Sequence, residues 1–205
     1  MTQVLVASGN AKKVEEMQRI LAARLDSVEV LGLGDVTPYD EPIEDEPTFA
    51  GNALLKARAG VAATGLPTIA DDSGLCVDAL NGMPGVLSAR WSGRPKSDER
   101  NNALLLDQLL DVPDERRTAH FTCAVAFVLP DGRELVVEGR MDGRVIREVR
   151  GSGGFGYDVL FEADDHPGLT TAELSREDKD AISHRGRALR EIAPQVAALL
   201  VGGPR

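Results

Sequence analysis

Two adjacent aspartates are the strongest chemical signal in the sequence. Asp71 and Asp72 directly follow the short apolar run Thr68-Ile69-Ala70, which we expect to be a buried strand, and Ser73 comes next. Two carboxylates after a buried strand are costly unless a metal ion, a proton or hydrogen bonds compensate for their charge. The pair suits Mg²⁺, which commonly takes one or two protein carboxylates together with substrate phosphate oxygens. The competing interpretation is a turn in which these side chains only cap a loop.

A second segment suits phosphate. It lies between a predicted strand and a predicted helix and consists of Ser8, Gly9, Asn10, Ala11, Lys12 and Lys13. Small residues at the start of a helix leave backbone N–H groups open at the positive end of the helix dipole, and two lysines would add charge there. An ordinary strand-to-helix turn with two solvated lysines explains the segment equally well. The chain has no G-x-x-x-x-G-K-[ST] loop, which excludes P-loop chemistry.

A third candidate is the glycine-rich segment at residues 151–158, which matches G-x-G-x-x-G. The run from Tyr157 to Phe161 after it is typical of a strand and not of a helix, so the dinucleotide-binding interpretation fails its structural condition. The segment could instead cover a planar base, and its aromatic side chains could equally be core residues beside a flexible turn. The candidate residues here are Phe155, Gly156, Tyr157 and Asp158.

Three side chains that can carry positive charge stand close together near the C-terminus: Lys179, His184 and Arg185. We expect Ser183 to cap the final helix, which places the last two near its positive end. Cations gain nothing from the helix dipole at that end, so an anionic or oxo-rich ligand explains them better. Surface charges at a helix start are the alternative.

The charge balance limits the possible partners. The chain has 205 residues and a formal net charge of −10, which excludes a protein that wraps polymeric nucleic acid and a basic membrane-surface protein. No Lys or Arg occurs between Leu25 and Leu55. This stretch is either a solvated loop or a source of cation ligands, and its acids are Asp26, Glu29, Asp35, Asp40, Glu41, Glu44, Asp45 and Glu46.

The elements that position these groups follow from local patterns. We expect strands at 4–7, 28–31 and 68–70, a helix with Val14, Met17 and Leu21 on one face, and a helix capped by Thr48 that ends near residue 65. In the second half we expect a helix over 97–110, strands at 119–129, 134–138 and 145–146, a hairpin turn at 130–132, and a helix over 185–200 that Pro194 kinks or interrupts. Open α/β sheets usually bind ligands at the loops that follow the carboxyl ends of their strands, and the predicted strands end in such polar loops.

These elements predict one α/β domain over residues 1–205, with two lobes because helices and hairpins alternate irregularly. Cys76 and Cys123 are not spaced for a disulfide framework or a zinc site, and we interpret His120 and His166 as structural. The N-terminus lacks the pattern of a signal peptide, and no apolar run is long enough for a membrane span. We therefore expect a reduced, cytoplasmic protein.

Taken together, the segments resemble the family of non-standard purine nucleoside triphosphate pyrophosphatases, the dITP/XTP or inosine triphosphate pyrophosphatases. Seven stretches match in the family's order over nearly the whole chain. They are SGNAKK at 8–13, TFAGNALLKA at 48–57, ADDSGL at 70–75, GMPGVLSARWSG at 82–93, GGFGYD at 153–158, TAEL at 171–174 and AISHRGRAL at 181–189.

The resemblance implies two lobes around a long mixed β-sheet with helices on its faces and a nucleotide cleft between the lobes. It also implies a homodimer, dependence on Mg²⁺, and hydrolysis of ITP, dITP and XTP to a monophosphate and pyrophosphate. Its phosphate site would be residues 8–13, with Lys13 the best-matching lysine and Lys56 approaching from the second helix. Asp72 matches the proton acceptor and metal-associated aspartate, and Ser73 matches a substrate contact.

Further roles follow from the same resemblance. Base and sugar would be held by residues 155–158 with Lys179, His184 and Arg185, whose donors would favour a 6-oxo group over the amino group of adenine. Glu44 is the best candidate for a second magnesium-linked carboxylate. Asp71 or Asp72 would deprotonate the attacking water, and the two aspartates would divide the base and metal roles.

Two residues depart from the family pattern. Gly51 stands where many members have an acid, so a metal-side or water-activating carboxylate is either missing or supplied by Glu44, Asp45 or Glu46. Val159 replaces a common proline, which affects only the loop. Two other functions therefore remain open: a pyrophosphatase for modified pyrimidine or standard triphosphates, and a nucleotide-binding regulator that has lost catalysis.

Overall fold

The computed structural model describes residues 2–9, 11–25 and 27–202, with the Lys12 side chain outside the described part. The strands are β1 (Thr2–Val6), β2 (Val28–Leu31), β3 (Thr68–Val77), β4 (Thr118–Val128), β5 (Glu134–Val145) and β6 (Phe161–Ala163). The α-helices are α1 (Ala11–Ala22), α2 (Phe49–Thr64), α3 (Asp98–Gln108), α4 (Arg176–Ile182) and α5 (His184–Val201). Short 3₁₀ turns cover Leu33–Asp35, Asp78–Leu80, Gly85–Arg90, Asp114–Arg116 and Gly156–Leu160.

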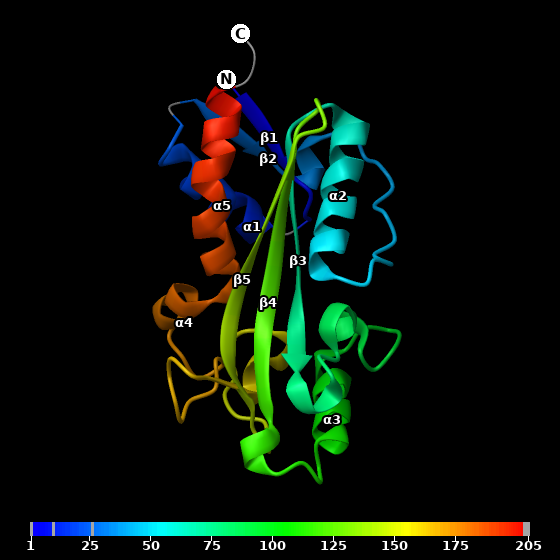
Figure 1. The fold of residues 1–205 in the computed structure, drawn as a ribbon, viewed down its shortest axis with the longest axis vertical. Coiled ribbons are helices and arrows are strands. Elements are labelled where there is room, and N and C mark those ends of the chain that lie inside the picture. Colours follow the sequence, from blue (N-terminus) through cyan, green and yellow to red (C-terminus); the bar gives the residue numbers. More distant parts are fainter. Residues whose placement is uncertain (1, 10, 26, 203–205) are drawn as a thin grey trace. The chain divides into compact units, whose positions relative to one another are not determined.

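The strands form one mixed sheet in the order β2-β1-β3-β4-β5-β6 (Figure 1). β1 runs parallel to β2 and to β3, with Val6 level with Ile69, and β6 runs antiparallel to β5. β4 and β5 are neighbours joined by residues 129–133, a connection too short for a parallel crossover, so they form a hairpin. The predicted α/β class with a long mixed sheet is confirmed.

The chain divides into two compact units, which agrees with the two lobes predicted from the sequence. The first unit comprises residues 1–72, 124–139 and 187–205, and the second comprises 73–123 and 140–186. Strands β3, β4 and β5 and helix α5 each contribute residues to both units.

In the first unit, α2 packs unusually close to the sheet. Thr48 accepts a hydrogen bond from Gly51 N at 3.0 Å and so caps the helix, which ends at Gly65 in the left-handed conformation. The buried residues Ala53, Ala57 and Gly60 are small. A Cβ atom on Gly60 would lie 2.7 Å from the Thr68 side chain. In Figure 1, α2 and α5 flank the strands of this unit on opposite sides.

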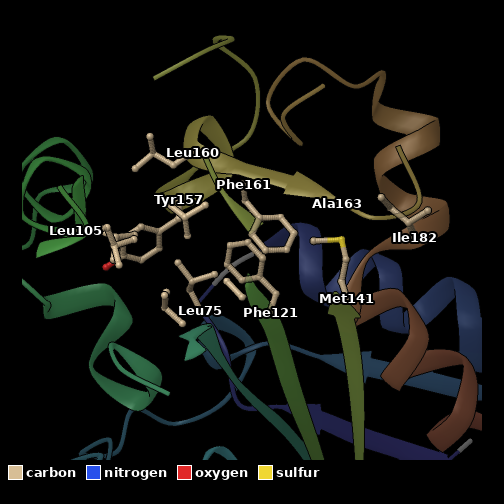
Figure 2. Packing of buried hydrophobic residues seen from close by; sticks show 13 residues of the cluster. Leu75, Leu105, Phe121, Met141, Tyr157, Leu160, Phe161, Ala163 and Ile182 are labelled. Carbon is tan, nitrogen blue, oxygen red and sulfur yellow. The ribbon is translucent and has the colours of Figure 1, made fainter. Parts of the chain in front are cut away.

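The second unit has its own hydrophobic core (Figure 2). The rings of Phe121 and Phe161 meet edge to face with their centroids 4.8 Å apart, and Leu75 and Leu160 are fully buried in the same cluster. Arg117 is 2% exposed and donates to three main-chain carbonyl groups near the end of α3 and of β5. Burial lowers the pKa of this guanidinium group, and the three carbonyls satisfy its donors.

Several predicted elements are correct, and their bounds were set by local signals. β1, β2, α1, α2, α3, β4 and α5 all occur where the patterns placed them. Ser183 caps α5 as expected, because its Oγ accepts from Gly186 N at 3.0 Å. Pro194 lies inside α5, which continues to Val201 and is not interrupted.

Three predictions are wrong, and one element was missed. β3 does not end at Ala70 but continues through Asp71, Asp72 and Ser73 to Val77, since partners outside the strand compensate for the polar side chains. Residues 145–146 add no separate strand, because β5 reaches Val145. The run at 157–161 is mainly a 3₁₀ turn, and only its last residue enters β6. Helix α4 was not predicted.

No helix in the described part of the chain has the length and apolar character needed to cross a membrane.

Candidate active site

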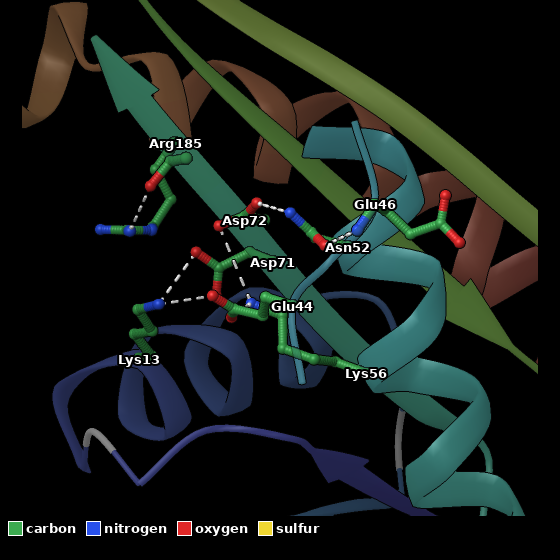
Figure 3. A network of polar contacts seen from close by, with 9 residues as sticks. Lys13, Glu44, Glu46, Asn52, Lys56, Asp71, Asp72 and Arg185 are labelled. Atoms are coloured by element: carbon green, nitrogen blue, oxygen red, sulfur yellow. Dashed lines mark hydrogen bonds and ion pairs between the residues drawn. The ribbon is translucent and has the colours of Figure 1, made fainter. Parts of the chain in front are cut away.

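The two adjacent aspartates lie in β3 and have different partners. Neighbouring side chains in a strand point to opposite faces of the sheet. Asp71 accordingly meets Lys13 of α1, whose Nζ lies 2.7 Å from Oδ1 and 2.9 Å from Oδ2 (Figure 3). Asp72 instead meets α2: its Oδ2 accepts from Asn52 Nδ2 at 3.0 Å. The strand thus divides the pair between two helices.

Lys56 brings a third carboxylate to this group. Its Nζ lies 2.8 Å from Glu44 Oε1 and 3.9 Å from Asp72 Oδ1. Glu44 comes from the acidic stretch before α2, so Lys56 joins that stretch to β3. The side chains of Lys56 and Asp72 are each 13% exposed, and in such partly buried surroundings charges interact more strongly than on an open surface.

The ion pairs of this network join carboxylates to ammonium groups on both sides of β3. The carboxylates are those of Glu44, Asp71 and Asp72, and the ammonium groups are those of Lys13 and Lys56.

Two carboxylates in this network fit Mg²⁺. Glu44 and Asp72 converge on the same ammonium group and are hard oxygen donors. The described residues include no group of three or more His, Cys, Asp or Glu side chains able to hold a metal ion. Mg²⁺ requires no such cage, since it is usually held by one or two carboxylates with substrate phosphates and water.

Ser8 and Gly9, which follow β1, lie beside the part of β3 that contains Asp71. β1 and β3 are parallel, and Ala7 N donates to Ile69 O at 2.8 Å, which brings the segment after β1 level with the residues after Ile69. Gly9 is exposed, with no atom within 4 Å of an ideal Cβ, and Ser8 is half-buried. Ala11 opens α1. Asn10 and the side chain of Lys12, both candidates from the sequence, lie outside the described residues.

In the second unit, Asp158 organises the glycine-rich segment. Its Oδ2 accepts from Phe155 N at 2.7 Å and from Lys179 Nζ at 2.6 Å, while its Oδ1 accepts from Thr171 Oγ1 at 2.8 Å. Lys179 also lies over the Phe155 ring, 5.3 Å from its centroid. Phe155 itself is 71% exposed, an unusual position for a large aromatic side chain. The segment therefore presents one flat apolar face beside a cation.

Tyr157 is placed differently from Phe155. It is buried in the core of the second unit, and its hydroxyl group donates to Ser88 O at 2.9 Å. Burial and, to a smaller extent, the charge of Asp98 raise the pKa of Tyr157. Only Phe155 of the two aromatic candidates is exposed to a ligand.

His184 and Arg185 begin α5 within the same unit. The His184 ring stacks on Phe121 with the centroids 5.0 Å apart and an angle of 13° between the rings. Arg185 Nη2 lies 3.4 Å from Ser73 Oγ. The packing of His184 fixes its ring plane, so its polar atoms have a defined direction.

Helix α3 supplies positioning residues that the sequence analysis missed. Gly156 N donates to Asp98 Oδ2 at 2.8 Å and Gly156 O accepts from Asn102 Nδ2 at 3.0 Å, so α3 holds both sides of this glycine. Asn101 is buried and its Oδ1 accepts from Ser92 N. Asn52 in α2 was missed as well. Asparagine is a poor helix former, so its presence inside two predicted helices was the signal available in the sequence.

The mixed sheet with its carboxylate and lysine network defines an α/β protein with a site suited to a metal-bound polyphosphate. The chain belongs to the Ham1 family, whose model matches residues 4–195. This membership confirms the resemblance found in the sequence motifs.

Two curated relatives and two solved structures illustrate the similarity. The dITP/XTP pyrophosphatase of Corynebacterium glutamicum is 59% identical over 199 residues, which cover 95% of this chain and 97% of that protein. The protein of the same name from Nocardia farcinica is 60% identical over 200 residues, 97% of each chain. The solved nucleoside-triphosphatase or dITP/XTP pyrophosphatase of Mycobacterium abscessus is 54% identical, with a TM-score of 0.84 over 95% of this chain and 100% of that one. The Staphylococcus aureus Ham1 protein is 36% identical, with a TM-score of 0.87 over 99% and 100%.

Proposed function

We propose that this chain hydrolyses the non-standard purine nucleoside triphosphates dITP, ITP and XTP to the monophosphate and pyrophosphate, and so cleanses the nucleotide pool. The network of Asp71, Asp72, Glu44, Lys13 and Lys56 is the observation that carries the proposal. It combines cations for a polyphosphate with carboxylates for a metal ion and a proton. Identities of 59% and 60% to proteins named dITP/XTP pyrophosphatase support the same substrate class.

The triphosphate binds to the segment at residues 8–13 and to two lysines. Backbone N–H groups in the first turn of α1 favour phosphate oxygens, because the start of a helix leaves them without helical partners. Lys13 and Lys56 supply positive charge on either side of β3. As charge develops on the departing pyrophosphate, ammonium groups already in place stabilise it without reorganisation.

In this proposal the two aspartates do not divide the base and metal roles as the sequence suggested, because Asp71 is occupied by Lys13 and both roles pass to Asp72. Asp71 has Lys13 on both of its oxygens and serves to hold that ammonium group. Asp72 is the proton acceptor. A water oxygen forms the new bond to phosphorus, the P–O bond between the α- and β-phosphates breaks, and the water proton passes to the Asp72 carboxylate.

Mg²⁺ would be held by Asp72 and Glu44. When bound, it polarises the phosphate oxygens and offsets their negative charge. Glu44 lies on Lys56 and is thereby kept close to Asp72.

The base is recognised by residues of the second unit. Phe155 offers an exposed ring for stacking, and Lys179, His184 and Arg185 offer hydrogen-bond donors. A 6-oxo group accepts hydrogen bonds from these side chains. The 6-amino group of adenine is itself a donor and would be left without an acceptor there. Ser73 contacts Arg185 and keeps it at the substrate.

The whole chain acts as one catalytic domain in this proposal. Strands β3, β4 and β5 pass through both units, which supports a single domain over residues 1–205. The resemblance further supports a homodimer. The net charge of −10 argues against polymeric nucleic acid as a partner, and we place the protein in the cytoplasm, where the nucleotide pool lies.

Pyrophosphate release from a panel of triphosphates tests the function. With Mg²⁺ present, dITP, ITP and XTP should be hydrolysed and ATP should not, and Asp72→Asn should abolish turnover while nucleotide binding remains measurable. Equal rates with ATP would refute the account of base selectivity. Activity only on pyrimidine or standard triphosphates would establish a different substrate class, and binding without turnover would establish a regulator.

A further inference from the structure

Asn52 links two segments of the first unit. It lies in the first turns of α2 and is completely buried. Its Nδ2 donates to Asp72 Oδ2 at 3.0 Å, and its Oδ1 accepts from Glu46 N at 3.1 Å (Figure 3). One amide side chain therefore contacts both β3 and the acidic stretch before α2.

The orientation of this amide is determined by its partners. A carboxylate offers only acceptors and a backbone N–H only a donor, so the NH₂ group must face Asp72 and the oxygen must face Glu46. The reverse orientation would set oxygen against carboxylate and N–H against N–H. Since asparagine also disfavours a helix, its place inside α2 is explained by these two contacts and not by helix propensity.

The two contacts act on the carboxylates of the proposed mechanism. One fixes Oδ2 of Asp72 and so restrains rotation of its carboxylate plane. The other fixes the backbone two residues after Glu44, whose carboxylate binds Lys56 at 2.8 Å. In Figure 3 the carboxylate of Glu46 itself points away from Asp72, so the backbone of Glu46, and not its side chain, takes part.

We propose that Asn52 is a positioning residue that holds Asp72 and the segment carrying Glu44 in one fixed arrangement. In this account it does not touch the substrate and acts only through Asp72 and the backbone of Glu46. The inference rests on the proposed function, because it assigns Asn52 an effect through Asp72. Partners that orient the groups of a metal site commonly contribute about 10- to 100-fold to activity.

Asn52→Leu tests this role, because leucine has a similar size and forms neither hydrogen bond. We expect kcat with dITP to fall about 10- to 100-fold while KM changes by less than about threefold. Hydrogen exchange at the Glu46 amide should become faster, since that N–H group loses its buried acceptor. This second readout does not depend on catalysis.

Gln18→Leu is a matched control. Gln18 in α1 also uses one side-chain amide for two hydrogen bonds, to Val28 O at 3.3 Å and from Val30 N at 2.8 Å. Its loss should lower the melting temperature and leave kcat unchanged. If Asn52→Leu lowers kcat no more than Gln18→Leu does, or leaves exchange at Glu46 unchanged, the proposal is overturned.

A second variant covers a failure of Asn52→Leu to fold. Asn52→Asp keeps an acceptor for Glu46 N and replaces the donor to Asp72 with a carboxylate. It should lose kcat while exchange at Glu46 stays slow, whereas wild-type kcat in this variant refutes the role toward Asp72. A wild-type protein that does not hydrolyse dITP would instead refute the proposed function, which separates the two outcomes.

Discussion

Lys13 Nζ contacts both carboxylate oxygens of Asp71, at 2.7 and 2.9 Å. The two side chains are 25% and 11% exposed, so water screens the pair only in part. In the proposed mechanism, this pairing makes Asp71 the partner of the lysine that binds phosphate, and Asp72 is the proton acceptor.

Replacing Lys13 should affect activity and stability separately. Lys13→Met should lower kcat/KM for dITP by about 10²-fold, because a preplaced positive charge at the phosphates is lost. It should also lower the free energy of unfolding, since Asp71 is left without its ammonium partner. In Lys13→Met with Asp71→Asn, stability measured in urea should recover while activity should not. Recovery of activity in the double variant would contradict the role of Lys13 at the phosphates.

Gly51 should resist replacement even by alanine. Its ideal Cβ would lie 2.8 Å from the Cβ of Glu46 and 3.1 Å from Thr48 Oγ1. Gly51→Ala should therefore lower the free energy of unfolding by about 1 kcal/mol, although alanine normally favours a helix by about that amount. Adding Glu46→Gly, which removes the nearest atom, should reverse the loss. Denaturant unfolding of the single and double variants provides the measurement, and a stabilised single variant would contradict the contact.

Phe155 should contribute to base binding and little to folding. Its ring is 71% exposed, and stacking of a base on an aromatic ring contributes about 1–3 kcal/mol. Phe155→Ala should thus raise KM for dITP by at least about fivefold with an unchanged melting temperature. Leu169→Ala is a suitable control, because Leu169 is another exposed apolar residue of the second unit, at 45%. A KM unchanged in Phe155→Ala would show that the base does not stack there.

Tyr157 should make the protein sensitive to alkaline pH. Burial raises the pKa of Tyr157 above its ordinary value of 10.0, so the folded state keeps the phenolic proton when the unfolded state has lost it. The stabilising effect is complete below pH 10 and is lost as the pH rises above that value. Thermal unfolding of wild type and Tyr157→Phe between pH 8 and 11.5 should show the steeper decline in the wild type. Parallel curves would argue against the burial of this phenol.

Elements with local signals were predictable from the sequence, and those held by distant partners were not. Thr48 and Gly65 mark the two ends of α2 in the sequence, and the apolar period of α1 is equally local. The polar residues of β3 were interpreted as a loop because their partners are remote: Lys13 lies 58 positions from Asp71, and Asn52 lies 20 positions from Asp72. A strand tolerates these carboxylates only when the folded chain supplies those partners.

The same distinction applies to the candidate site. Lys56 was a candidate because it lies in a matched motif, and Glu44 was the preferred one of several acids in the stretch before it. The structure brings these two side chains together at 2.8 Å. Asn52 lies within the matched stretch at 48–57, but an uncharged amide there indicated no particular chemistry. The roles proposed for Asn52 and Asn102 follow from the contacts that they make in three dimensions.

Gly60, which has no side chain, influences the site through the packing of α2. A Cβ atom there would come within 2.7 Å of the Thr68 side chain and 3.2 Å of the Leu5 side chain, so with any larger residue either those side chains or α2 must shift. Both Asn52 and Lys56 are carried by this helix and reach Asp72 from it. The accuracy with which carboxylate, amide and ammonium meet therefore depends on close packing of α2 against two buried side chains, two turns of helix beyond Asn52.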